Sequence, residues 1–274
     1  MKIGGYRGSG NYSERTGGIG VGGGLGIGGV VLALVAMFFG VDPSVVLNTA
    51  GQMGTSSQPQ QETSTPRDET GKFMSQVLAS TEDVWTQIFR ASGSEYPAPK
   101  MVRFEGGTRT ACGMGQAAMG PFYCPGDQTV YIDSSFLREL STRFRAPGDF
   151  AAAYVIAHEV GHHVQRVTGV MRQLEAARGR SSQREYNQMS VRIELQADCL
   201  AGVWGAHAAR AGLLEPGDVE EGIAAAAAVG DDRLQKQSQG RVVPEAFTHG
   251  SSAQRVAAFR RGMETGNPSA CETR

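Results

Sequence analysis

Apolar residues recur at helical spacing over five long stretches of the chain, and shorter extended runs lie between the first two of these. Gly and Pro interrupt the extended runs, as is typical of short strands. The predicted helices cover residues 72–92, 147–169, 182–212, 215–237 and 251–266, and the extended runs cover 97–113 and 129–140. This pattern predicts a mainly helical domain with a small sheet, an α+β fold, in which "TVYID" at 129–133 is the clearest strand.

The N-terminal pattern is different, because residues 19–41 contain no charged residue and end in a densely apolar stretch. A stretch of this length can cross a bilayer as one helix. Lys2, Arg7 and Arg15 precede it and no Lys or Arg follows before Arg67, so the positive-inside rule places the N-terminus in the cytoplasm. A cleaved signal peptide is the alternative, but no A-x-A cleavage site follows the apolar stretch.

The chain is therefore expected to have four parts. These are a cytoplasmic tail at 1–18, a single transmembrane helix at 19–41, a polar flexible linker at 42–70 and a folded domain at 71–274 that lies in the periplasm or outside the cell. Glycines at four-residue spacing in the apolar segment predict a contact between two such helices, and thus a homo-oligomer. The formal net charge of −1 offers no reason to expect binding to nucleic acid.

Three of the five histidines crowd into "AHEVGHHVQ". His158 and His162 are four residues apart on a predicted helix, so both imidazoles project from one face and can bind the same ion. Glu159, between them, can take a proton from a zinc-activated water. His163 lies about 100° around the helix from His162, and His207 is expected to point elsewhere, so neither is assigned to the metal. A buried, hydrogen-bonded polar cluster is the alternative for this motif.

A catalytic zinc ion takes three protein ligands, so one must come from elsewhere in the chain. Position 168 is Thr, which excludes the motif with a third histidine. Glu194 and Asp198 share one face of a later predicted helix. Glu194 can complete a site for one Zn²⁺ per chain, and Asp198 can accept the free N–H of a ligand imidazole. A solvated carboxylate paired with Arg192 is the alternative for Glu194.

The combination of H-E-x-x-H with the later E-x-x-A-D resembles the gluzincin metallopeptidases, the zincins whose third ligand is a glutamate. Together with the glycine-rich apolar segment, "ELQADCLAGVW" and "FTHGSSAQRVAAF", it resembles more closely the bacterial family called putative neutral zinc metallopeptidases. The resemblance covers about residues 17–261. It implies a zincin-like, membrane-anchored metallopeptidase domain built around the H-E-x-x-H helix.

A further stretch, "THGSSAQR", resembles the T-H-P-S-x-x-x-R segment of membrane-associated gluzincins. The resemblance implies that His249 either donates a hydrogen bond to the oxyanion or blocks the open zinc position at rest. Arg255 would then be a supporting charge. Gly250 stands where proline is usual, a departure that affects the expected rigidity of the loop.

The four cysteines do not form a CxxC pair. Cys112 and Cys124 flank a short glycine-rich loop, and an oxidising compartment predicts a disulfide between them. Two unpaired buried thiols are the alternative. Cys199 and Cys271 can form a second bridge if the C-terminus folds back.

These observations predict a zinc metalloendopeptidase that cleaves peptides or proteins with Glu159 as general base. Residues 129–133 are expected to be an edge strand along which the peptide lies. One alternative is a catalytically weak, zinc-stabilised envelope scaffold, although a scaffold needs only the ligands and not the base. Another is a zinc hydrolase of non-protein amides such as cell-wall peptides, which the sequence does not separate from proteolysis because pocket shape decides the substrate.

Overall fold

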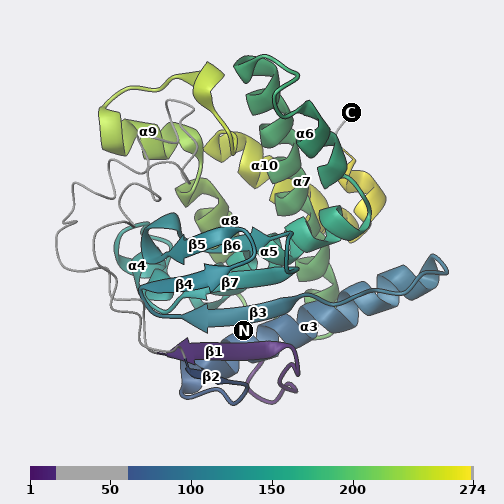
Figure 1. Cartoon of the computed structure of the whole chain (residues 1–274). Coiled ribbons are helices and arrows are strands. Elements are labelled where there is room, and N and C mark those ends of the chain that lie inside the picture. Colours follow the sequence, from purple (N-terminus) through teal and green to yellow (C-terminus); the bar gives the residue numbers. More distant parts are fainter. Residues whose placement is uncertain (17–60, 273–274) are drawn as a thin grey trace.

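The computed structural model describes residues 1–16 and 61–272, and within them it has a mixed sheet, a hairpin and a set of helices (Figure 1). The strands are β1 (Tyr12–Thr16), β2 (Gln61–Thr63), β3 (Lys100–Phe104), β4 (Gly107–Thr110), β5 (Gly113–Gln116), β6 (Phe122–Cys124) and β7 (Thr129–Asp133). The helices are α3 (Glu69–Ala91), α4 (Phe136–Thr142), α5 (Asp149–Val167), α6 (Met171–Ala177), α7 (Gln183–Arg210), α8 (Asp218–Ala228), α9 (Asp231–Gln239) and α10 (Ser252–Thr265). The predicted α+β class is confirmed.

The main sheet has the strand order β2-β1-β3-β7-β6, and β4 and β5 form a separate antiparallel pair. The three central strands β1, β3 and β7 run parallel, whereas β2 and β6 are antiparallel to their neighbours. All five residues of β7 are buried. This burial fits a central strand, and it contradicts the expectation that residues 129–133 form an edge; on this side of the sheet the edge is β6 instead.

In the view of Figure 1, helices α6, α7, α9 and α10 lie above the sheet. Helices α3 and α5 pack against the strands, α7 and α8 pack against α5, and α10 packs against α7 and α8. Phe150 of α5 stacks on Trp204 of α7 with ring centroids 5.7 Å apart. Helices α10 and α7 approach closely at Gly262 of α10, where a Cβ atom would lie 1.9 Å from the carbonyl oxygen of Cys199. Only glycine permits this approach, which brings α10 against α7 and therefore Arg255 toward the histidine helix.

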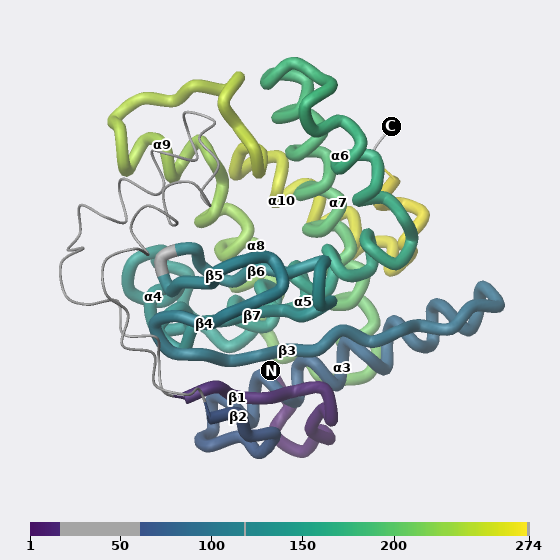
Figure 2. Tube along the Cα trace, in the orientation of Figure 1, coloured from purple at the N-terminus to yellow at the C-terminus, as the bar shows by residue number. Residues whose placement is uncertain are grey.

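The N-terminal residues belong to the domain, so the expected separate tail at 1–18 is wrong for residues 1–16. The purple N-terminal trace runs beside β3 (Figure 2), and Tyr12 pairs with Met101 in parallel register. The buried Glu14 of β1 forms ion pairs with Arg67 and with Arg103 of β3. Strands of one sheet share a compartment, so we expect residues 1–16 to lie on the same side of any membrane as β3.

The expected boundary between linker and domain is also wrong, because residues 61–70 are structured. Gln61 and Glu62 of β2 pair with Thr16 and Arg15 of β1, and α3 begins at Glu69 with Asp68 as its N-cap. The expected transmembrane helix at 19–41 and its glycine contact lie outside the described residues, as does the linker up to residue 60. Among the described helices, none is both long enough and apolar enough to cross a membrane.

The helix expected over 215–237 is divided into α8 and α9. Gly230, between them, has an extended backbone, and a Cβ atom there would lie 2.4 Å from the backbone nitrogen of Ser252. The close approach of α10 therefore ends α8, and α9 starts anew at Asp231. Ser251 caps α10, in a reciprocal capping box with Gln254.

Both predicted disulfides are present. Cys112 is bonded to Cys124, which joins the β4–β5 hairpin region to β6. Cys199 of α7 is bonded to Cys271, so the C-terminal segment does fold back onto the domain. Neither pair is therefore left as free thiols.

Candidate metal centre

Two imidazoles and one carboxylate meet between α5 and α7. Candidate ligand atoms of His158, His162 and Glu194 all lie within 4.8 Å of one another. The Nε2 atoms of His158 and His162 are 3.2 and 3.4 Å from the two carboxylate oxygens of Glu194. Tetrahedral zinc with bonds of about 2.0–2.1 Å separates its ligand atoms by about 3.3 Å. The three predicted ligands thus fit a zinc ion in type and in spacing.

A glycine permits this meeting of the two helices. A Cβ atom at Gly161 would lie 3.0 Å from the carbonyl oxygen of Ala197 on α7. Helix α7 can approach α5 closely at this point, one residue before His162 and one turn after Glu194 along the helix. Without that approach the carboxylate of Glu194 would lie too far from the imidazoles to share an ion with them.

Asp198 orients the first histidine. Its Oδ1 lies 2.8 Å from the Nδ1 of His158, which leaves the Nε2 of that ring for the metal. The Nε of Arg255 donates to Oδ2 of Asp198 at 2.8 Å, and the hydroxyl of Tyr154 donates to Oδ1. Asp198 is fully buried and Arg255 is 4% exposed. Arg255 therefore acts on Asp198 and does not reach the substrate side as a free charge, and Tyr154 is part of this network.

Gln165 orients the second histidine, a role that the sequence reasoning missed. Its Oε1 lies 2.9 Å from the Nδ1 of His162, and its Nε2 donates to the carbonyl oxygen of Ile193, beside Glu194. Gln165 follows His162 by three residues, a spacing that places two side chains on one helix face. This three-residue spacing in the sequence could have indicated that Gln165 contacts His162. Both ligand imidazoles thus have a fixed ring orientation.

The charges of the centre shift its pKa values. Burial lowers the pKa of His158, but the charge of Asp198 and hydrogen bonds to Asp198 and Glu194 outweigh it and raise this pKa to about 10. Burial raises the pKa of Asp198, yet Arg255 and His158 bring it down to about 2. The pKa of Glu194 lies well below its usual value because His162 and other positive groups outweigh desolvation. The centre is an anionic cluster that attracts either protons or a divalent cation.

Glu159 is buried beside the two histidines, with 7% of its surface exposed. Within residues 1–16 and 61–272 no group donates a hydrogen bond to its carboxylate. A carboxylate with no protein donor can accept the proton of a water molecule. Its position and its lack of a partner fit the predicted general base.

The sequence reasoning also missed Asp231, which holds the loop of His249. Oδ2 of Asp231 accepts hydrogen bonds from the backbone N–H groups of Thr248, His249 and Gly250 at 2.8, 2.6 and 2.9 Å. Oδ1 lies 3.2 Å from the Nδ1 of His249. The expected helix over 215–237 hid this residue, because Asp231 gains its role only where α9 starts anew.

His249 itself is half-exposed at the rim of the centre. Desolvation lowers its pKa, but the charges of Glu194 and Asp231 outweigh this effect and the net shift is upward. Since Asp231 takes Nδ1, the Nε2 of His249 is the atom left for a ligand or substrate. Gly250 has φ +94°, a value that proline does not reach, so this loop is built differently from one with the usual proline.

The two histidines set aside do lie away from the ligands. His163 is fully buried, and its ring bonds to the hydroxyl of Tyr123 and the carbonyl oxygen of Pro97. The Nε2 of His207 lies 3.1 Å from the carbonyl oxygen of Gly266, at the end of α10. Both are structural.

The chain is similar to several known proteins. The chain is 51% identical over 244 residues to "Uncharacterized protein YpfJ" of Escherichia coli K12, covering 89% of this chain and 84% of that protein. It is 44% identical over 206 residues to "Uncharacterized protein Rv2575" of Mycobacterium tuberculosis H37Rv, covering 71% and 67%. No solved structure matches the chain. The family model described as "Putative neutral zinc metallopeptidase" matches residues 2–274, and the chain belongs to that family.

Proposed function

We propose that this protein is a zinc-dependent endopeptidase of the gluzincin type. The observation that carries the proposal is the meeting of His158, His162 and Glu194, with ligand atoms within 4.8 Å. Beside them lies the carboxylate of Glu159, to which no described residue donates a hydrogen bond. The zincin-like character of the domain is part of the same proposal. Membership of the zinc metallopeptidase family supports it.

Each residue of the centre has a distinct task in this proposal. Zinc, when bound, would polarise the scissile carbonyl and make a water molecule more acidic. Glu159 takes a proton from the attacking water and returns it to the leaving amine. His249, held by Asp231, donates from Nε2 to the oxygen that gains negative charge.

The experiment compares the wild-type chain with Glu159→Gln and, as a control, Glu175→Gln, which alters an exposed glutamate of α6. Zinc content and cleavage of a broad peptide library are measured with and without chelator. The proposal expects Glu159→Gln to retain one zinc per chain and lose cleavage, while Glu175→Gln keeps both. Cleavage by zinc-loaded Glu159→Gln at the wild-type rate would contradict the mechanism. If the wild-type chain and both variants all bound zinc and none cleaved a peptide, the scaffold would be favoured.

The compartment is a separate proposal: the domain, with residues 1–16, lies outside the cytoplasm. Two disulfides support it, because such bonds persist mainly in oxidising compartments. Attachment to a membrane through residues 19–41 stays a proposal. In this proposal residues 1–16 and the domain after residue 60 lie on the same side of that membrane. Lys2→Cys and Lys100→Cys, two exposed positions, test it. An impermeant thiol reagent should label both in spheroplasts, and labelling of only one would contradict a shared compartment.

A further inference from the structure

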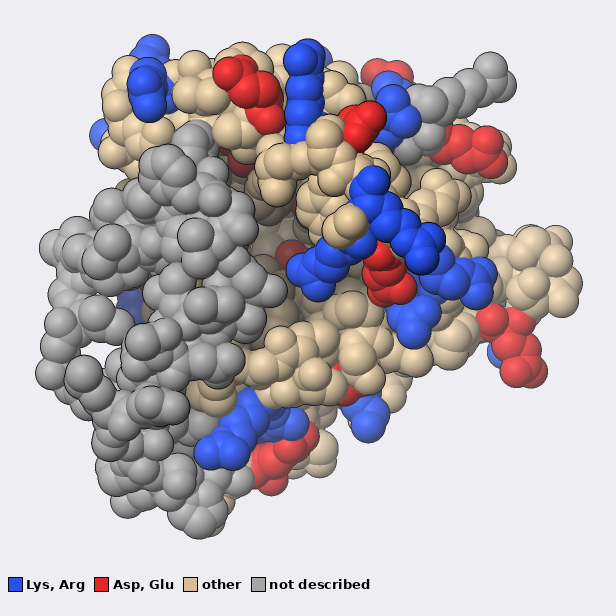
Figure 3. Space-filling view, turned by 45° about the horizontal axis from the view of Figure 1, so that its top comes forward, with Lys and Arg blue, Asp and Glu red and all other residues tan. Residues whose placement is uncertain are grey.

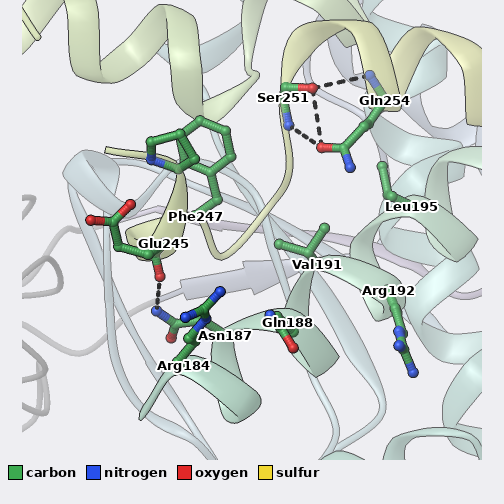
Figure 4. A pocket seen from close by; sticks show the side chains of 11 residues that line it. Arg184, Asn187, Gln188, Val191, Arg192, Leu195, Glu245, Phe247, Ser251 and Gln254 are labelled. Atoms are coloured by element: carbon green, nitrogen blue, oxygen red, sulfur yellow. Dashed lines mark hydrogen bonds between the residues drawn. The ribbon is translucent and has the colours of Figure 1, made fainter. Parts of the chain in front are cut away.

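A pocket of about 650 Å³ lies beside the metal centre, between α7 and the segment around residues 244–254 (Figure 4). Side chains from the N-terminal half of α7 form one wall, and Phe247 stands across from them. The residues that matter here are Arg184, Gln188, Val191, Arg192, Leu195 and Phe247.

The pocket adjoins the metal centre through the loop of His249, because a Cβ atom at Gly250 would lie 3.3 Å from the side chains of Val191 and Leu195, which line the pocket. Arg184, Gln188, Val191 and Leu195 follow one another at helical spacing, and Glu194 adjoins Leu195. From Glu194 to Arg184 the helix rises about 15 Å, the length of about four residues of extended peptide. A peptide whose scissile bond lies at the metal therefore reaches Arg184 with its fourth residue on that side.

The chemistry of the pocket changes along this path. Near the metal centre, Val191, Leu195 and Phe247 are half-buried apolar side chains. Farther out, Figure 4 places Arg184 and Arg192 on either side of Val191. Both arginines are exposed, and neither has an ion pair with a carboxylate in the described part of the chain.

The carboxylate in the pocket lining does not face the two arginines. Glu245 is the acidic residue of the pocket, and its side chain points away from both arginines in Figure 4. Its backbone oxygen accepts a hydrogen bond from Asn187 at 3.2 Å. The carboxylate of Glu245 therefore does not pair with either guanidinium group.

The surrounding segment strengthens the positive field. Residues 166–192 contain six arginines and two glutamates, although the whole chain has a formal net charge of −1. Figure 3 shows Lys and Arg side chains gathered beside a hollow in this face of the molecule. Clustered charge of one sign beside a cleft concentrates ligands of the opposite sign.

We infer that this pocket is the substrate subsite that selects an apolar side chain beside the cleaved bond and a carboxylate within about four residues of it. This inference rests on the proposed endopeptidase function. The carboxylate is either an acidic side chain or the free C-terminus of the peptide. Arg184 and Arg192 bind it through charge-assisted hydrogen bonds, which are stronger than bonds between neutral groups.

The test uses matched fluorogenic peptides that have one apolar residue beside the bond and Glu, Gln or Lys placed two to four residues away. Each is made with a free and with an amidated C-terminus, so that the two sources of the carboxylate are separated. The variants are Arg184→Gln with Arg192→Gln, and Arg184→Glu. The control is Arg90→Gln, which removes an exposed charge on α3.

The expected result is a preference of about five- to tenfold in kcat/KM for the peptide with a carboxylate, lost in the double variant, since exposed ion pairs contribute up to about fivefold each. Arg184→Glu should shift the preference toward the Lys peptide, and Arg90→Gln should keep the wild-type preference. An equal rate on Glu, Gln and Lys peptides, or a preference that survives the double variant, would overturn the inference.

Binding separates this inference from the catalytic proposal. The affinity of labelled peptides for the full chain carrying Glu159→Gln is measured by fluorescence anisotropy, with the same arginine substitutions added. If peptides with a carboxylate bind more tightly but the wild-type chain does not cleave them, the catalytic proposal is wrong and the subsite inference stands. If the wild-type chain cleaves peptides without a preference for the carboxylate, the subsite inference is wrong and the catalytic proposal stands.

Discussion

Replacement of Asp198 by Asn is the sharpest probe of how the fold holds the metal centre. Oδ1 of Asp198 forms a hydrogen bond with the Nδ1 of His158 at 2.8 Å. Arg255 donates two hydrogen bonds to the same carboxylate, from Nε at 2.8 Å and from Nη2 at 2.9 Å. Asparagine keeps the shape of the side chain but loses its charge, and its amide group brings two donors toward Arg255. The guanidinium of Arg255 is then left buried without a counter-charge.

The two expected effects have different magnitudes. Removing one partner of a buried ion pair costs about 3–5 kcal/mol, so the metal-free Asp198→Asn protein should unfold at a lower urea concentration than the wild type. Loss of the partner that orients a ligand imidazole weakens metal binding by about 10- to 100-fold. Urea unfolding followed by tryptophan fluorescence gives the first value, and zinc competition against a chromogenic chelator gives the second.

A double variant separates stability from metal binding. Asp198→Leu combined with Arg255→Met removes both charges and fills the space with apolar atoms, a change that is often neutral or stabilising. We expect the metal-free double variant to recover most of the lost stability, whereas zinc affinity stays low because His158 still lacks its acceptor. If the folded Asp198→Asn protein bound zinc as tightly as the wild type, the orienting role of Asp198 would be refuted.

Three further predictions concern other parts of the fold. Asp231→Asn should lower kcat by about 10- to 100-fold with zinc retained, because the loop of His249 loses a charged acceptor worth about 1.5–3 kcal/mol per bond; unchanged kcat would contradict it. Replacing Cys199 and Cys271 with Ser opens a closure of 72 residues. That change should lower the free energy of unfolding by about 4 kcal/mol, measured in urea, and an unchanged midpoint would argue against the bridge. The pKa of Glu14 is lowered, since bonds to Arg67 and Tyr12 outweigh desolvation. Its contribution should be complete above pH 4.5 and lost as pH falls through the lower native pKa, and Glu14→Gln should flatten that part of an acid-unfolding curve.

Local geometry explains why much of the centre could be predicted. A four-residue spacing on an α-helix always places two side chains on one face, so His158 with His162, and Glu194 with Asp198, followed from spacing alone. The need of zinc for a third protein ligand then connected the two helices. The same reasoning excluded His163 from the metal ligands, and its ring is hydrogen-bonded to Tyr123 and Pro97.

Other features depend on contacts between distant segments. Asp231 reads as an ordinary residue inside a helix until the approach of α10 at Gly230 divides that helix. The pairing of β1 with β3 carries no local signal, since it joins residues about 90 positions apart, and a polar stretch with isolated charges reads equally well as a tail.

The sequence by itself determined the chemistry of this protein: which side chains can hold zinc, which carboxylate can serve as base and which cysteines can bridge. Only the tertiary structure decided how these groups are oriented, where the N-terminal residues belong and which arginines line the pocket beside the centre. The physical reason is that a helix fixes the relation of residues three or four apart. The close approach of one helix or strand to another depends on packing across the whole domain.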